Sequence, residues 1–306
     1  LNMKLSKKNL STLKNHISPY LLNKIQNYKS YFKFLPYKKL LKINYELRDK
    51  HKNKRCFLLG SGKSIDLEDL TLLKNEIVIS IHSLAYHPNF KDICNTNTAK
   101  YHFESPIHGP SEEEDWIKHF EDLDKTIPNN VICLFGLDNY EPNSKSILEK
   151  NNLFNEKKIF WFFSNVINSS QSYKFCDSDL DMQSNIWTAK TGSICALICS
   201  LYMGFNEIYL LGMDHDYFMR DIGDARFDSI DKTKFSLKKE IEILETHKKQ
   251  GINEAKLTNT FQQLSEIFEQ YEKLNDLFPN RIYNLGRNSL LDMFPNRQLN
   301  NVLKKV

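Results

Sequence analysis

Residues 55–69 of this 306-residue chain read RCFLLGSGKSIDLED, and this stretch decides the fold class. The four apolar residues at 56–59 run directly into Gly60, Ser61, Gly62, Lys63 and Ser64. A short apolar run that ends in glycines is typical of a buried parallel strand that meets the start of a helix. Glycines let the backbone approach a ligand, and free N–H groups at a helix start favour an anion. We therefore expect a nucleotide phosphate here; the alternative is a tight turn without a ligand.

The alternation of strand and helix continues along the rest of the chain. Predicted strands lie at residues 56–59, 77–81, 100–103, 131–135, 159–163, 207–211 and 281–285, and predicted helices at 67–74, 112–122, 144–150, 193–203, 234–249, 254–277 and 289–294. This order predicts a Rossmann-like α/β fold, with a mostly parallel sheet and helices on both faces. Ligands of such sheets bind beyond the C-terminal strand ends. The polar and glycine residues that follow predicted strands are His82, Ser83, Glu104, Ser105, Gly136, Gly212, Asp214 and His215.

The composition is that of an ordinary globular protein, with 41% hydrophobic and 26% charged residues. No apolar run reaches the length of a bilayer-spanning helix and no signal peptide opens the chain, so we expect a cytoplasmic protein. The six cysteines include no CxxC pair, and four of them lie in apolar runs. This pattern indicates buried, reduced thiols, and neither a zinc site nor a disulfide framework.

A basic N-terminal arm, residues 1–54, precedes the predicted α/β domain at residues 55–306. Residues 1–55 carry 15 lysines and arginines but two acidic residues, whereas the whole chain has a net charge of +4. Lysines alternate there with Leu, Ile, Tyr and Phe, which suits docking of residues 1–50 on an anionic inner-membrane surface. The alternative is a helical extension packed on the body. We expect no nucleic-acid partner, because no recognition motif accompanies the charge; a homo-oligomer is left open.

Two further segments near the strand ends suit a ligand site. Thr191, Gly192 and Ser193 open an apolar helix and present free N–H groups to an anion. The segment at about 215–251 is polar, with few apolar residues, and is predicted to be a lid that closes over the ligand.

Two rival enzyme classes can be weighed on short motifs. Gly62, Lys63 and Ser64 match the end of the P-loop motif, but Phe57 stands where that motif needs its first glycine. A match would imply a Mg²⁺-dependent phospho- or diphosphotransferase. The acidic residues at 177–181 suggest a metal-dependent transferase of the DxD kind, or a solvated acidic loop. A third reading is a non-catalytic, nucleotide-binding scaffold at the membrane.

Three islands of sequence resemble the bacterial sialyltransferases of glycosyltransferase family 42. They are GSGKS after a strand, TGS followed by a helix and GFNEIYLLGMD, and Tyr283-Asn284 with the later run Asn288-Ser289-Leu290-Leu291. The resemblance implies a GT-A-like variant of the fold without a metal or other cofactor. It also implies inverting transfer of sialic acid, or a related nonulosonic acid, from a CMP-activated donor to a bacterial surface glycan such as lipopolysaccharide or capsule.

The resemblance also implies which residues hold the donor. The expected donor-binding set is Gly60, Ser61, Gly62, Lys63, Ser64, His82, Ser83, Thr191, Gly192, Ser193, Gly212, Asp214, Asn288, Ser289 and Leu290. Ser61 and Lys63 replace the family's usual Asn and Pro, which leaves the donor open among sialic, legionaminic and pseudaminic acids.

The transfer requires a base that takes the proton of the acceptor hydroxyl, and histidine suits this role. His247 is the positional match to the family's lid histidine. His215 is the competitor, because it lies closer to a strand end. For each, the alternative is a solvated or packing histidine. The departing phosphate needs hydrogen-bond donors in place of a metal, and the candidates are Tyr217, Lys190, Lys63 and Arg220.

Overall fold

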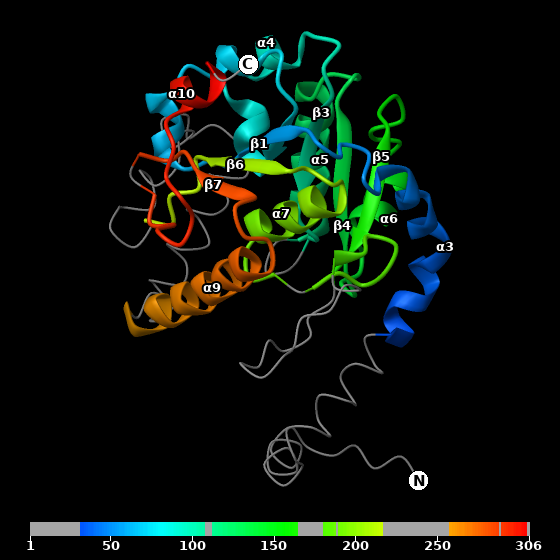
Figure 1. The fold of residues 1–306 in the computed structure, drawn as a ribbon. Coiled ribbons are helices and arrows are strands. Elements are labelled where there is room, and N and C mark those ends of the chain that lie inside the picture. Colours follow the sequence, from blue (N-terminus) through cyan, green and yellow to red (C-terminus); the bar gives the residue numbers. More distant parts are fainter. Residues whose placement is uncertain are drawn as a thin grey trace, which may run out of the picture.

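A computed structural model describes residues 31–107, 112–164, 180–187, 189–216, 257–287 and 289–304. Its centre is a seven-stranded sheet in the order β5-β4-β3-β2-β1-β6-β7, and every strand pair is parallel (Figure 1). The strands are β1 (Arg55–Leu59), β2 (Val78–Ile81), β3 (Lys100–Glu104), β4 (Ile132–Leu137), β5 (Ile159–Phe163), β6 (Glu207–Leu211) and β7 (Ile282–Asn284). The Rossmann-like α/β prediction and all seven predicted strands are therefore confirmed.

Helices cover both faces of this sheet. The α-helices in the described ranges are α3 (Lys38–Leu41), α4 (Phe90–Cys94), α5 (Glu113–Thr126), α6 (Ser144–Lys150), α7 (Gly192–Tyr202), α9 (Leu257–Leu277) and α10 (Leu299–Leu303). Short 3₁₀ helices are η1 (Leu35–Tyr37), η2 (Lys42–Leu47), η3 (Lys63–Leu67), η4 (Leu70–Leu73) and η5 (His82–Tyr86). The helices predicted around α5, α6, α7 and α9 are confirmed; the bounds of α6 match the prediction and those of the others differ by up to four residues.

The alternation of side chains along the strands explains why both faces are covered. On β1, Cys56 and Leu58 join the cluster packed under α7 and α9, whereas Phe57 and Leu59 join the opposite cluster with η4 and α10. Over β4 and β5, α5 and α6 cover that opposite face. Figure 1 accordingly shows the sheet between α7 on one side and α5 on the other. Strands buried on both faces favour apolar residues at most positions, which is why β1 and β5 read as nearly continuous apolar runs.

Two predicted helices are wrong. The segment predicted at residues 67–74 forms the separate turns η3 and η4, because Asp69 accepts hydrogen bonds from the N–H and hydroxyl groups of Thr71 at 3.0 and 2.6 Å and starts a new turn. The segment predicted at 289–294 is irregular. Its backbone bonds elsewhere: the Leu290 N–H donates to the Asp214 carbonyl at 3.0 Å. The predicted helix at 234–249 lies outside the described residues.

The described part of the N-terminal arm packs against the domain. Phe34, Leu41 and Leu47 are buried, and the Asn44 side chain donates to the carbonyls of Trp161 and Met182 at 2.7 and 2.6 Å. Figure 1 shows α3 beside β5. Residues 31–54 therefore match the packed-extension alternative. Some of their aromatic side chains are exposed, so docking on a membrane surface stays a prediction. No helix in the described ranges is long and apolar enough to cross a bilayer.

Candidate functional site

The strand order places a topological switch point between β1 and β6. The chain leaves β1 towards β2 on one side, and returns to the other side of β1 only with β6. In open parallel sheets, ligands bind beyond the carboxyl ends of the strands at such a point. The glycine-rich segment after β1 and the segment after β6, both predicted to hold the donor, therefore meet there.

Two glycines allow these segments to touch. The Gly60 N–H donates to the Leu211 carbonyl and the Gly62 N–H to the Gly212 carbonyl, each at 2.8 Å. A Cβ atom at Gly60 would lie inside contact distance of the Gly212 carbonyl oxygen. Gly212 has a φ of +68°, which L side chains rarely adopt. The glycines thus join the two loops to each other. The N–H groups of Gly60 and Gly62 already donate hydrogen bonds across this contact.

Asp214 occupies the position where the sequence predicts a phosphate. Its carboxylate accepts hydrogen bonds from the Ser64 N–H, at 2.8 Å, and from the Ser64 hydroxyl, and it is buried. Lys63 pairs with Asp66 at 3.2 Å, so its ammonium also has a partner within the protein. An internal anion therefore caps η3, and the N–H of Ser64 is engaged without a ligand.

The third sequence island lies against the same loop. The Ser289 hydroxyl donates to the Met213 carbonyl at 2.8 Å, and the Leu290 N–H bonds to Asp214. Residues 76 positions apart in the chain thus stand together, as the predicted donor-binding set requires. Asn288 lies outside the described residues.

The N-terminus of α7 lies at the same edge of the sheet, beside the ends of β2 and β3. The Thr191 carbonyl accepts from the N–H groups of Ile194 and Cys195, at 3.1 and 3.3 Å. The N–H groups of Gly192 and Ser193 donate to no group within the described ranges. A Cβ at Gly192 would lie 2.7 Å from the Ser105 hydroxyl oxygen and closer still to His82. Here the structure retains the anion-binding geometry that the first loop lacks.

His82 leads into a buried polar network that the predicted site omits. His82 Nδ1 lies 3.0 Å from Glu104 Oε2, and its Nε2 lies 3.1 Å from the hydroxyl oxygen of Ser105. Glu104 also contacts Nε2 of His102 at 3.0 Å and Nε2 of His119 at 3.6 Å. Burial by itself raises the pKa of Glu104, but the charge of His82 and the hydrogen bonds from the three histidines outweigh it and hold the pKa well below its usual value. The carboxylate is therefore ionised.

The sequence pattern did indicate this network, because Glu104 and Ser105 directly follow the strand predicted at residues 100–103. Parallel register brings them beside β2, since Ile81 pairs with Phe103. Ser83, one residue beyond His82, has a buried hydroxyl without a hydrogen-bond partner in the described part of the chain. No group of three or more potential ligands within the described ranges has the geometry of a metal site.

His215 is held in a second chain of hydrogen bonds. Its Nε2 lies 3.1 Å from the Tyr271 hydroxyl, which donates to the Ser193 hydroxyl at 2.7 Å. Burial lowers the pKa of His215 to about 4, although Asp216 opposes the shift. This chain of hydrogen bonds joins the end of β6 to the start of α7, and the burial of His215 keeps its imidazole neutral at pH 7.

Acidification should destabilise the fold between pH 6.5 and 4. Burial lowers the pKa of His51, which stacks on Phe205, to about 4, as it does for His215. The unfolded chain binds protons near pH 6.5 and the folded chain does not, so the free energy of unfolding falls as the pH falls through this window. We expect a loss on the order of 1–2 kcal/mol per histidine between pH 7.5 and 5, measured by urea denaturation. His51→Phe should reduce the loss; an unchanged pH dependence in that variant would contradict the assignment.

Several predicted residues cannot be placed. His247, Tyr217 and most of the predicted lid at 215–251 lie outside the described residues, as do the first two aspartates of the acidic run at 177–181. Asp181, which is described, accepts from the Gln183 N–H at 3.0 Å and pairs with Arg48 at 3.4 Å.

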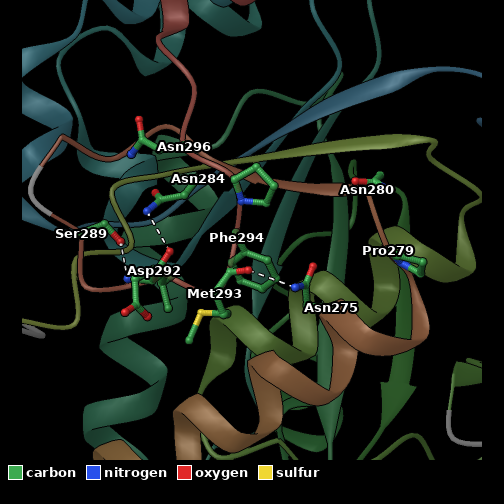
Figure 2. A pocket seen from close by; sticks show the side chains of 11 residues that line it. Asn275, Pro279, Asn280, Asn284, Ser289, Asp292, Met293, Phe294 and Asn296 are labelled. Carbon is green, nitrogen blue, oxygen red and sulfur yellow. Dashed lines mark hydrogen bonds between the residues drawn. The ribbon is translucent and has the colours of Figure 1, made fainter.

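A cavity of about 610 Å³ lies next to the switch point, between the C-terminal end of α9, β7 and residues 289–296. Four of the eleven residues that line it are asparagines. The Asn275 amide donates to the Met293 carbonyl at 3.0 Å and the Asn284 amide to the Leu291 carbonyl at 3.2 Å. Figure 2 shows the side chains of Asn275 and Asn284 at this cavity. Ser289 is the predicted site residue that reaches it. The amides thus mainly brace the loop that carries Ser289.

Comparisons with known proteins assign neither a family nor a function to this chain. No protein-family model matches the chain, and no curated protein matches it. The resemblance to family 42 therefore stays a prediction. The features that bear on function are the geometry at the switch point and the start of α7.

Proposed function

We propose that this chain is an inverting, metal-independent glycosyltransferase. Its donor is a CMP-activated sialic acid or related nonulosonic acid, and its acceptor is a bacterial surface glycan. One observation carries the proposal: the backbone of Gly192 lies directly beside His82 at the carboxyl edge of a Rossmann-like sheet, and within the described ranges the N–H groups of Gly192 and Ser193 have no acceptor. An anion site next to an imidazole is what transfer from a sugar phosphate requires.

The proposed reaction needs one bond to form and one to break. The acceptor oxygen attacks the anomeric carbon of the donor from the face opposite the phosphate, and the carbon–oxygen bond to CMP breaks. The electron pair of that bond leaves with the CMP phosphate, and the acceptor proton passes to a base. N–H groups at the start of α7 would stabilise the phosphate or the donor carboxylate, in place of a metal.

The rival phosphotransferase has less support. Its mechanism needs Lys63 and the N–H groups of the glycine-rich loop to contact a β- or γ-phosphate. Lys63 instead pairs with Asp66, and the N–H groups of Gly60, Gly62 and Ser64 donate within the protein. No observation favours this rival over glycosyl transfer.

CMP should raise the melting temperature of the purified chain, equally with Mg²⁺ and with EDTA. A ligand at about 100 times its dissociation constant adds about 2.7 kcal/mol to stability, which is an easily measured shift. Stabilisation by ATP or UDP alone, and only with Mg²⁺, would contradict the proposal. Release of CMP from CMP-activated nonulosonic acids in the same buffers then separates an enzyme from a scaffold that only binds.

A further inference from the structure

His82 occupies a strained position directly after β2. Its φ of +49° lies in the left-handed region, which non-glycine residues rarely adopt and which is often found at functional sites. The side chain is 36% exposed. The strand end therefore holds this imidazole at the carboxyl edge of the sheet, with part of its surface open.

Glu104 fixes which nitrogen of His82 carries the proton. The carboxylate is ionised, so it accepts a hydrogen bond, and Nδ1 must be the donor. Nε2 then carries the lone pair and accepts from the hydroxyl of Ser105. His102 and His119 hold the same carboxylate from β3 and from α5. This is the arrangement in which a carboxylate orients a histidine base and stabilises it once protonated.

Nε2 of His82 lies against the start of α7, where the proposed donor would bind. The backbone of Gly192 is so close that a Cβ there would overlap His82 Nε2 and the Ser105 hydroxyl. The first N–H group that would hold the anionic donor therefore belongs to Gly192, the residue whose backbone lies against the imidazole. A hydroxyl group that bonds to His82 Nε2 in place of Ser105 is next to the donor site.

The other described histidines at this edge are less suited to the role. His215 is buried, bonds through Nε2 to the Tyr271 hydroxyl, and has a pKa lowered to about 4. His102 is fully buried, with Nδ1 on Ser80 at 2.9 Å and Nε2 on Glu104. The base of a transfer at neutral pH needs an accessible lone pair and a partner for its proton.

We propose that His82 is the general base of the transfer, positioned by Glu104. The acceptor hydroxyl displaces Ser105 from His82 Nε2 and gives its proton to that nitrogen as its oxygen bonds to the anomeric carbon. The imidazolium is stabilised by Glu104 until the proton leaves to solvent. This inference rests on the proposed function, but the base and the donor class can fail separately.

His82→Asn and His215→Asn in the full chain are a matched pair, because both histidines have left-handed backbones that asparagine tolerates. We expect His82→Asn to lower kcat by about 10²- to 10⁴-fold while CMP still stabilises the protein. His215→Asn should lower kcat less than His82→Asn does, because Nε2 of His215 is already bonded to the Tyr271 hydroxyl. Glu104→Gln should lower kcat with little change in the KM of the donor, since the carboxylate no longer orients the imidazole and stabilises its protonated form. A purely structural role for Glu104 would instead appear as lost stability and weaker CMP binding.

Nucleotide release is measured with CMP-, UDP- and GDP-activated sugars, with and without acceptor glycans. If His82→Asn retains the wild-type kcat, His82 is not the base. If the variant loses CMP binding together with kcat, the base assignment is also overturned, and His82 binds the donor instead. Turnover of UDP- or GDP-sugars by the wild type would refute the CMP donor, and the same variants with that donor would still decide on His82. A wild type that turns over no donor overturns both proposals.

Discussion

Replacing Gly60 by alanine should destabilise the protein by about 3 kcal/mol or more, or prevent folding. The added Cβ would overlap the carbonyl oxygen of Gly212, and this obstacle is backbone that cannot rotate away. Overpacking of a well-packed interior costs about 1–3 kcal/mol, and more where the obstacle is rigid. Strands β1 and β6 would have to separate at their carboxyl ends. Urea denaturation of the purified variant measures the effect.

Ser61→Ala is the matched control for this substitution. It changes the neighbouring position of the same loop without adding an atom, and its effect should stay within about 0.5 kcal/mol. If the free energy of unfolding of Gly60→Ala lies within about 1 kcal/mol of the wild-type value, the contact between the loops after β1 and β6 is not as close as described.

Asp214→Ala should cost about 2–4 kcal/mol of stability. The substitution removes a carboxylate that accepts two hydrogen bonds from Ser64 and leaves that buried N–H without a partner. Hydrogen bonds to charged groups contribute about 1.5–3 kcal/mol each, and an unsatisfied buried donor costs about 1–3 kcal/mol. Urea denaturation at pH 7.5 measures the loss.

A double-mutant cycle with Ser64→Ala separates this contact from general damage. The two positions should couple by at least about 1 kcal/mol, because their side chains bond directly. Asp66→Ala is the control: this half-exposed carboxylate pairs with Lys63, and an exposed ion pair is worth at most about 1 kcal/mol. Additive effects of the Asp214 and Ser64 substitutions would show that the carboxylate does not cap η3.

The sheet was predictable from the sequence because each strand is buried on both faces. Runs such as FLL in β1 and IFWFF in β5 have no polar position, and few other structures tolerate that. The turn at Asp69 was not predictable from apolar spacing. Leu70 and Leu73 have helical spacing, but a side-chain hydrogen bond of Asp69 to Thr71 restarts the backbone between η3 and η4.

The candidate site was predictable in position but not in its internal bonds. The sequence places GSGKS and Asp214 at neighbouring strand ends, and they do meet there. Pattern alone cannot reveal that the carboxylate of Asp214 caps Ser64, since that bond joins residues 150 positions apart. For the same reason the link from His82 to Glu104 depends on the register of β2 against β3, which only the folded sheet provides.

The central claim is that a nucleotide binds at the start of α7, beside the loops that follow β1 and β6. Hydrogen exchange of the full chain, with and without saturating CMP in EDTA, tests it most directly. CMP should slow exchange in peptides that cover residues 191–195, where the N–H groups of Gly192 and Ser193 have no acceptor among the described residues. Unchanged exchange there, or protection confined to the asparagine-lined cavity at residues 275–296, would contradict the claim.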